Sequence, residues 1–320
     1  MHIFKSLAAG LFALCCFANL SAVQVPDQLN LSGGYRNDVI SAHTTITEPS
    51  GFTTVDRLRF DNIDLGVVGL EYRFTLPQCD RCCEHPFLRN FYVDGYAYWG
   101  WSESDDFARN VNEGFEDANT TFISTGHQKA RTEDFQIALG YLVYNCDCWA
   151  VGLKGGYAYN YQRVRTSSGS TAVEAGPATA DPVYSGLVLK QRWQGPWLGA
   201  EVFFSTCCDV LVNIGYEYHF AHYHALFDVP AATEAGLANF TNKKSAHSAY
   251  GNVGYINAHY SLCDCWDVGL GFTYKLYRTR HTSVSPVGGF VAAGFPEGTT
   301  GSARSKWISY SILADVGYTF

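Results

Sequence analysis

The sequence is short of charge and, beyond its amino terminus, has no long apolar run. Charged residues make up 16 % of its 320 residues, against about 25 % in a typical soluble domain. The absence of an apolar run of about 18 residues excludes a helical membrane protein. Basic residues are outnumbered, since the net charge is −8, and this argues against a nucleic-acid partner. Aromatic residues (15 %) and 31 glycines are abundant instead, which is not the composition of a disordered chain.

The first 22 residues have the features of a secretory signal peptide. Lys5 supplies a positive charge, Leu7 to Leu20 is apolar, and Ser21-Ala22 offers a small-residue cleavage site. A buried amino-terminal helix is the alternative. We expect a signal peptide over 1–22 and an exported mature chain over 23–320, which keeps nine of the eleven cysteines.

Most of the remaining chain alternates between apolar and polar residues with a period of two. In the clearest segment, Asp267 and Lys275 lie on one face with glycines. Such alternation predicts a β-strand, because helical spacing would scatter the apolar side chains around the axis. The last segment alternates in the same way and ends on Phe320. The apolar face of the clearest segment carries Trp266, Val268, Leu270, Phe272, Tyr274 and Leu276.

Ten strands of this kind are predicted, and most are long enough to cross a bilayer at a tilt. A soluble β-sandwich is the alternative, but its strands usually have about five or six residues. The fold class is therefore an all-β transmembrane barrel, antiparallel and up-and-down, over residues 23–320. The predicted strands cover 28–40, 57–76, 88–103, 132–145, 149–164, 184–204, 209–222, 248–262, 266–280 and 306–320.

The predicted connections alternate between short and long, as in outer-membrane barrels with short periplasmic turns and long external loops. An even number of strands places both chain ends in the periplasm. We expect tryptophans at the membrane interfaces, with Trp149 and Trp266 on the periplasmic side and Trp99, Trp101, Trp193, Trp197 and Trp307 on the outer side. The short connections are 77–87, 146–148, 205–208 and 263–265, and the long ones are 41–56, 104–131, 165–183, 223–247 and 281–305.

All nine cysteines beyond residue 22 lie in the four short turns. Cys-x-Cys and Cys-Cys pairs are poorly placed to close on themselves, so disulfides between neighbouring turns or to other proteins are expected in the oxidising periplasm. An odd number leaves at least one thiol free or intermolecular. A zinc site is the competing interpretation, because the segment from Cys79 to His85 has ligand-like spacing. The cysteines are Cys79, Cys82, Cys83, Cys146, Cys148, Cys207, Cys208, Cys263 and Cys265.

An acidic, tyrosine-rich barrel with cysteines confined to its turns and an aromatic last residue resembles the cysteine-rich outer-membrane porins of chlamydia-like bacteria. These include the chlamydial major outer-membrane protein and the Protochlamydia outer membrane protein family. The segment from Trp193 to Gly199 is also similar to the Legionella major outer-membrane protein. The resemblance implies a pore-forming barrel, disulfide-linked into a network that stiffens the envelope. It also implies that Phe320 helps the barrel-assembly machinery recognise the chain.

The polar face of the predicted strands carries charges of both signs between glycines. Such a face either lines a narrow aqueous path and tunes ion selectivity, or pairs its charges and plugs a small barrel. Both interpretations stay open at this point, and the acidic excess favours cations if a path exists. The residues expected to face the lumen are Arg36, Asp38, Glu71, Arg73, Asp94, Lys154, Glu201, Glu217, His219, His259, Lys275 and Asp315.

Ten-strand barrels also include the omptin proteases, which use paired aspartates and an aspartate–histidine couple at the outer rim. Asp105-Asp106 and the stretch His222–Asp228 superficially supply such groups, but their spacing does not match. His219, His222 and His224 do not form a metal site, because alternation places His219 opposite the other two. We therefore expect no enzyme, no catalytic residue, no metal and no cofactor.

The sequence thus predicts a porin-like barrel in the bacterial outer membrane that admits small hydrophilic solutes or ions. The alternative is a structural or adhesive surface barrel without an open pore. Its expected partners are membrane lipid, the barrel-assembly machinery and, through disulfides, envelope proteins or further copies of itself.

Overall fold

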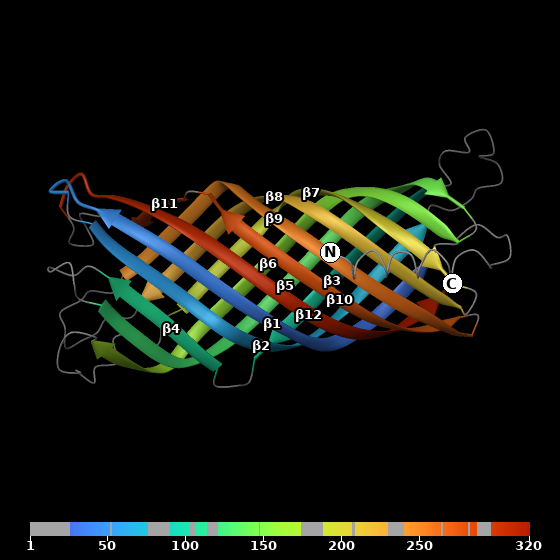
Figure 1. Ribbon diagram of the computed structural model, residues 1–320, viewed down its shortest axis with the longest axis horizontal. Helices are drawn as coiled ribbons and strands as arrows, with labels where there is room; N and C mark the ends of the chain where they lie inside the picture. Colours follow the sequence, from blue (N-terminus) through green and yellow to red (C-terminus); the bar gives the residue numbers. More distant parts are fainter. Residues whose placement is uncertain are drawn as a thin grey trace, which may run out of the picture.

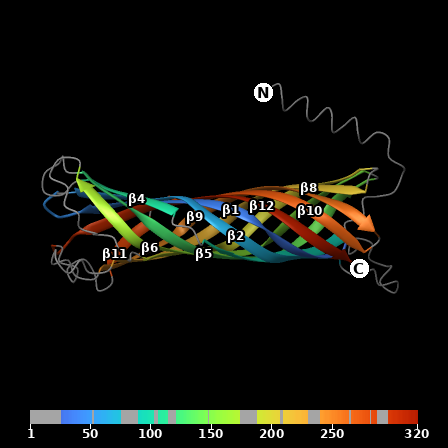
Figure 2. The ribbon, with the colours of Figure 1, turned by 90° about the horizontal axis from the view of Figure 1, so that it is seen from below.

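Successive side chains of each strand point alternately to the two faces of the wall. The strands form a closed antiparallel β-barrel whose long axis is horizontal in Figures 1 and 2. Within the described residues no helix is long and apolar enough to cross a membrane. The expected signal peptide over 1–22 lies outside the described residues. The computed structural model describes residues 26–51, 53–75, 90–102, 106–113, 121–146, 148–173, 188–206, 209–229, 240–263, 265–280, 282–286 and 296–320.

Twelve strand segments form the barrel wall in the part of the chain that is described. They are β1 (Gln28–Thr47), β2 (Thr53–Thr75), β3 (Phe91–Trp101), β4 (Asp106–Glu113), β5 (Thr121–Asn145), β6 (Trp149–Val173), β7 (Val188–Ser205), β8 (Val210–Val229), β9 (Phe240–Cys263), β10 (Trp266–Thr279), β11 (Thr282–Pro286) and β12 (Thr300–Thr319).

These segments occupy ten positions around the wall. β3 and β4 both lie between β2 and β5, and β10 and β11 both lie between β9 and β12. β1 closes the barrel, because it pairs with β2 on one side and with β12 on the other. β1 begins and β12 ends at the same end of the barrel, which we call the terminal end (Figure 1). The predicted ten-strand antiparallel barrel is confirmed.

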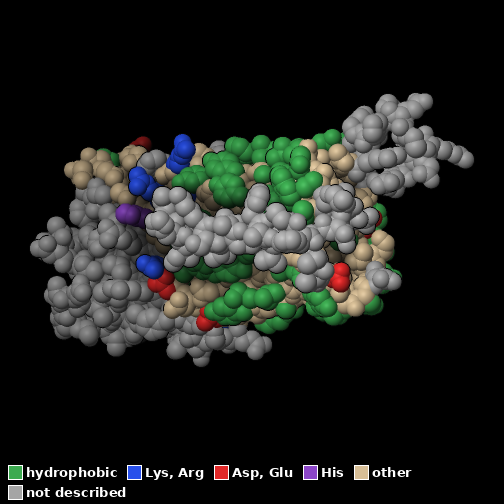
Figure 3. All heavy atoms as spheres, turned by 45° about the vertical axis from the view of Figure 1, so that its right-hand side comes forward, with side chains coloured by type: hydrophobic (Ala, Val, Ile, Leu, Met, Phe, Trp, Pro, Cys, Tyr) green, Lys and Arg blue, Asp and Glu red, His purple; other side chains and the backbone are tan. Residues whose placement is uncertain are grey.

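The two faces of the wall differ as the alternation requires. Large apolar side chains such as Leu270 and Ile312 are exposed on the outside, whereas Asp315 and Lys275 are buried inside. Figure 3 shows the outer face, where hydrophobic side chains cover the wall over the terminal half and lysine, arginine and histidine lie towards the opposite end. An apolar belt bounded by polar residues is the surface that a bilayer requires.

The strands run much further from the terminal end than the sequence predicts. β5 pairs with β6 from Phe122 opposite Val173 down to Asn145 opposite Ala150, so most of the predicted loop 104–131 and the first nine residues of the predicted loop 165–183 are strand. The predicted boundaries of the long loops are therefore wrong. The reason is that a strand outside the membrane needs no apolar face, while its backbone groups still gain from pairing with a neighbour.

Two irregularities lie within the strands. Asn62 has a positive φ of 53°, which asparagine tolerates better than most residues, and it accompanies a register shift between β1 and β2. Pro196 has no amide hydrogen, and the pairing of β7 with β8 skips Gly195 and Pro196. β7 begins at Val188, four residues after the predicted start at 184.

The placement of three tryptophans corrects the prediction. Trp193, Trp197 and Trp307 were expected at the outer membrane interface, yet they are at most 1 % exposed and point into the barrel. Trp99, Trp101, Trp149 and Trp266 are exposed on the outer face. The prediction was wrong for the first three because the strands continue past them, so they lie away from the strand ends and on the inward side of the alternation.

Candidate functional site

The interior of the barrel holds the charged side chains that the sequence places on the polar face. The structure encloses most of them, and Glu71, Arg73 and His259 are partly exposed within the barrel. Whether they line a conducting path stays a prediction. The buried members are Arg36, Asp38, Asp94, Lys154, Glu201, Glu217, His219, Lys275 and Asp315.

One group of four charges spans the lumen, and we call it the ion-pair layer: Arg36, Asp38, Asp134 and Lys275. Arg36 Nη1 donates to Asp134 Oδ2 at 2.7 Å, and Arg36 also donates to both carboxylate oxygens of Asp38 at 2.8 Å. Lys275 Nζ donates to Asp134 Oδ2 at 2.8 Å. Because β5 and β10 lie half-way round the wall from each other, the Lys275–Asp134 contact crosses the lumen.

A second group of charges lies nearer the terminal end. Lys154 Nζ lies 3.3 Å from Asp94 Oδ2, 3.4 Å from Glu201 Oε2 and 3.3 Å from Glu217 Oε1. Arg73 Nη2 lies 3.6 Å from the carboxylates of both Asp94 and Glu201. These three acids and two bases come from five different strands, so opposite charges pair across the interior with one acid in excess.

A layer of apolar side chains, which we call the apolar layer, lies beyond the ion-pair layer along β1. Trp307 stacks on Tyr277 with ring centroids 5.1 Å apart, and Trp193 packs between Tyr277 and Tyr223. The guanidinium of Arg36 lies 5.1 Å from the Trp307 ring and joins the two layers. The apolar layer takes residues from eight strands: Ile40, Ala42, Phe60, Ile63, Leu65, Val67, Val164, Leu189, Trp193, Ala221, Tyr223, Ala225, Ala249, Val253, Tyr277, Trp307 and Leu313.

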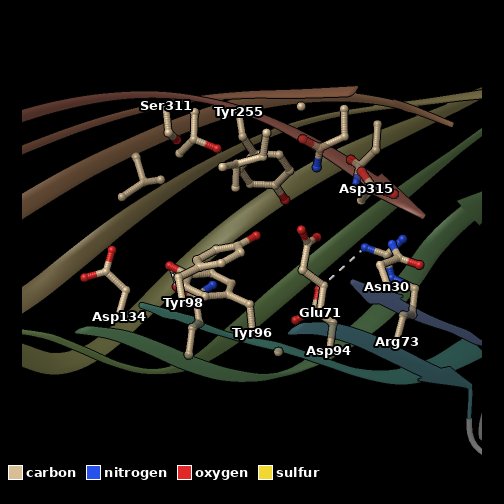
Figure 4. Close-up of a pocket in the computed structure, with 18 of the residues that line it drawn as sticks. Asn30, Glu71, Arg73, Asp94, Tyr96, Tyr98, Asp134, Tyr255, Ser311 and Asp315 are labelled. Carbon is tan, nitrogen blue, oxygen red and sulfur yellow. Dashed lines mark hydrogen bonds and ion pairs between the residues drawn. The ribbon is translucent and has the colours of Figure 1, made fainter. Parts of the chain in front are cut away.

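A cavity of about 130 Å³ lies between the ion-pair layer and the terminal end. Figure 4 shows Asp134 at one end of this cavity, Asn30 and Asp315 at the other, and the rings of Tyr96 and Tyr98 between them. Five acidic and four basic side chains line it: Glu71, Asp94, Asp134, Glu217 and Asp315, with Arg36, Arg73, Lys154 and Lys275. The cavity is therefore rich in charged groups, although Val67, Val253 and Leu313 of the apolar layer line it as well. The ion-pair layer and the rest of the apolar layer lie between the cavity and the far end of the barrel.

Inward glycines provide the space for inward tyrosine rings. The ring of Tyr92 lies where a side chain at Gly140 would project, and Tyr255 covers Gly215 in the same way. The Tyr92 hydroxyl donates to Glu201 Oε1 at 2.5 Å. A tyrosine ring packed against a glycine fills the interior where two large side chains on neighbouring strands would not both fit. This pairing accounts for the inward glycines at these two positions.

Sequence reasoning missed Asp134, which binds both cations of the ion-pair layer. A signal was present, because Phe135 and Ile137 point outward and the alternation therefore turns Asp134 inward. The cross-lumen contacts of Asn160 were missed too, and these have no sequence signal. Asn160 Nδ2 donates to the Tyr277 hydroxyl at 3.2 Å across four positions of the wall.

The described cysteines lie at the terminal end. Cys146, Cys263 and Cys265 carry free thiols. The carbonyl of Cys148 accepts from the amide of Ser205 at 3.0 Å, which places it beside the end of β7. Disulfide formation stays a prediction, because the remaining candidates lie outside the described residues: Cys79, Cys82, Cys83, Cys207 and Cys208.

The residues considered for other sites do not gather in the described structure. His219 points inward while His222 and His224 point outward, as the alternation predicts. Asp105 lies outside the described residues, as does the segment from Cys79 to His85, and only the backbone is described for Asp106 and Asp228. Phe320 is exposed, with its ring centroid 5.4 Å from that of Phe74, and its role in assembly stays a prediction.

Comparison with known proteins now decides the family. The family model for the Protochlamydia outer membrane protein matches residues 30–320. The chain belongs to this family. The resemblance to the Protochlamydia family expected from the sequence is thus confirmed, and the protein is an outer-membrane β-barrel. No curated protein matches the chain.

A solved structure shares the architecture. The outer membrane protease OmpT from Escherichia coli has a TM-score of 0.68 at 12 % identity, over 94 % of this chain and 99 % of its own. At this identity the likeness shows the fold alone. The outer membrane protein OprG from Pseudomonas aeruginosa matches at 13 % identity over 92 % of this chain and 96 % of its own, with a TM-score of 0.33.

Proposed function

We propose that this protein is a porin-like outer-membrane channel that is closed at rest and admits small ions when its interior layers separate. The observation that supports the proposal is the polar cavity, which is lined by charges of both signs and ends at the ion-pair layer. Charged rings select ions, and apolar constrictions close by excluding water. With five acidic and four basic side chains around the cavity, we expect a modest preference for cations.

The test is planar-bilayer conductance of the refolded protein. We expect rare openings of small amplitude from the wild-type chain, because both layers must rearrange before an ion passes. A shift of the reversal potential in a potassium chloride gradient measures the cation preference. A membrane that stays silent with inserted wild-type protein, and equally silent with a variant that lacks the Asp134 carboxylate, would contradict the channel.

A second candidate function is that of a structural or adhesive barrel without an open pore. The specific observation that favours it is the apolar layer, which is buried across eight strands. The strands also extend well beyond the apolar belt, since β5 pairs with β6 as far as Phe122 opposite Val173. Neither of the two proposed functions is enzymatic. The likeness to the protease OmpT concerns the fold alone.

We also propose that cysteines at the terminal end link the protein covalently to its neighbours. Cys263 and Cys265 are exposed in the turn between β9 and β10, where a partner thiol can reach them. Non-reducing gels of intact envelopes are expected to show high-mass bands that reductant converts to the monomer. Replacement of Cys263 and Cys265 by serine should remove part of these bands. A monomer band that is insensitive to reductant in the wild type would contradict the linkage.

A further inference from the structure

Three side chains with metal-binding atoms meet inside the barrel at the terminal end. They are His259 on β9, Asp267 on β10 and Asp315 on β12, and their ligand atoms all lie within 4.8 Å of one another. These strands are neighbours in the wall. β12 pairs with β1 at the seam where the first and last strands of the barrel meet. The cluster therefore lies beside this seam.

The spacing of these atoms is wider than that of paired charges. His259 Nδ1 lies 3.4 Å from Asp267 Oδ1 and 3.4 Å from Asp315 Oδ1, whereas a charge-assisted hydrogen bond is about 2.7–2.9 Å long. Two ligand atoms bound tetrahedrally at about 2.1 Å to one zinc ion lie about 3.4 Å apart. These two distances thus fit ligands of one shared cation better than direct hydrogen bonds between His259 and the two carboxylates.

An independent observation comes from Asn30 on β1. Its side chain is 5 % exposed, and its Oδ1 is buried without a hydrogen-bond partner. A side chain at Gly317 would collide with both Asn30 Oδ1 and Asp267 Oδ1, so these two oxygens border one small space. Asn30 Oδ1 has no donor, and the carboxylate beside it cannot supply one, so a cation is favoured in this space.

The arrangement around Asp267 resembles the outer shell of a metal site. Gln28 Nε2 donates to Asp267 Oδ2 at 2.9 Å, and Thr319 Oγ1 donates to the same oxygen at 3.3 Å. These bonds orient the carboxylate and leave Oδ1 directed at His259. Hydrogen bonds of this kind hold metal ligands in position in known sites.

We propose that Asn30, His259, Asp267 and Asp315 bind one divalent transition-metal ion, with zinc as the fitting probe. One nitrogen and three oxygens are ligands that zinc accepts, while the absence of sulfur from the set separates this site from the cysteine turns. Bound metal would join β1, β9, β10 and β12 on the inside of the wall, across the seam. Its role is to stabilise the closed barrel, independently of whether the lumen conducts ions.

The test is isothermal titration of the refolded full-length barrel with zinc chloride, after alkylation of all thiols to remove cysteine binding. We expect about one zinc per chain. The His259→Gln variant should bind at least about 100-fold more weakly. The matched control is His222→Gln, which removes an exposed histidine from the outer face and should leave the affinity unchanged. Equal binding by wild type and His259→Gln, or no binding by the alkylated wild type, would overturn the proposal.

A second variant keeps the proposal testable if His259→Gln does not fold. Asn30→Asp replaces an amide oxygen by a charged ligand and should tighten zinc binding by about tenfold. Zinc should also raise the melting temperature of the alkylated wild type, because a ligand that binds only the folded state stabilises it. X-ray absorption of the zinc-loaded protein should show nitrogen and oxygen neighbours. Weaker zinc binding by Asn30→Asp would contradict the site.

Discussion

Replacement of Asp134 by alanine is expected to lower the free energy of unfolding by about 3–5 kcal/mol. Asp134 Oδ2 accepts from both Arg36 and Lys275, at 2.7 and 2.8 Å, and all three side chains are buried. Arg36 keeps Asp38 as a partner in the variant. Among the described residues, Lys275 then keeps hydrogen bonds to the neutral oxygens of Tyr96 and Asn160, at 3.3 and 3.4 Å. An uncompensated buried ammonium is the main cause of the loss. Urea unfolding of the barrel refolded in phospholipid vesicles measures it.

The neighbouring residue provides a matched control. Glu133 points outward and pairs with Arg131, whose side chain is 64 % exposed, so Glu133→Gln should cost no more than about 1 kcal/mol. The double variant Asp134→Ala with Lys275→Met removes both charges, and its loss should be clearly smaller than the sum of the two single losses. Strict additivity would contradict the cross-lumen contact.

Removal of Asp134 should also alter conductance. The Lys275–Asp134 contact holds β10 to β5 across the lumen. Its loss weakens the ion-pair layer, which is one of the two layers between the cavity and the far end of the barrel. We expect more frequent openings than in the wild type, and a smaller preference for cations because an acidic group has left the cavity. Glu133→Gln is expected to conduct as the wild type does. An unchanged opening frequency in Asp134→Ala would indicate that the apolar layer alone closes the lumen.

Replacement of Trp307 by alanine is expected to cost about 3–5 kcal/mol, because it leaves a large cavity in the apolar layer. Trp307 is fully buried, stacks on Tyr277 and lies 5.1 Å from the guanidinium of Arg36. The alanine variant loses the contact with the Tyr277 ring and the contact with the Arg36 guanidinium. The loss is measured by urea unfolding followed by circular dichroism, which does not depend on the tryptophan that has been removed.

A second tryptophan separates the effect of burial from the effect of residue type. Trp266 is 49 % exposed at the terminal end of the outer face, so Trp266→Ala should cost roughly 1–2 kcal/mol. Trp307→Ala should in addition raise the conductance, since water can enter the space it leaves, whereas Trp266→Ala should not. Equal costs for the two variants would contradict the inward placement of Trp307.

The interior combines two obstacles of different chemistry. The ion-pair layer is polar and holds strands on opposite sides of the lumen together, while the apolar layer closes the lumen by side-chain packing. Opening of one layer leaves the other in place. Because two layers lie in series along the lumen, we expect the proposed channel to have a low conductance.

The inward and outward faces of the strands could be read from the sequence with few errors. Leu270, Ile312 and Ile137 are outward and Asp94, Lys154 and Glu217 are inward, as the period of two requires. Alternation is local, because successive side chains of any strand point to opposite sides. The outer limits of the strands were not predictable in this way, since beyond the apolar belt the outer face is polar while the inner face carries apolar side chains such as Val164 and Ala225.

The sequence by itself determined the class of fold, the number of strand positions and the face on which each charge lies. Tertiary structure alone decided that the charges pair across the lumen, that Trp193, Trp197 and Trp307 fill it, and that Asn30 meets the cluster of His259, Asp267 and Asp315. The physical reason is closure. Contacts such as that between Asp134 and Lys275 join residues 141 positions apart, and they exist only after the curvature of a ten-strand wall has brought opposite strands within reach of two side chains.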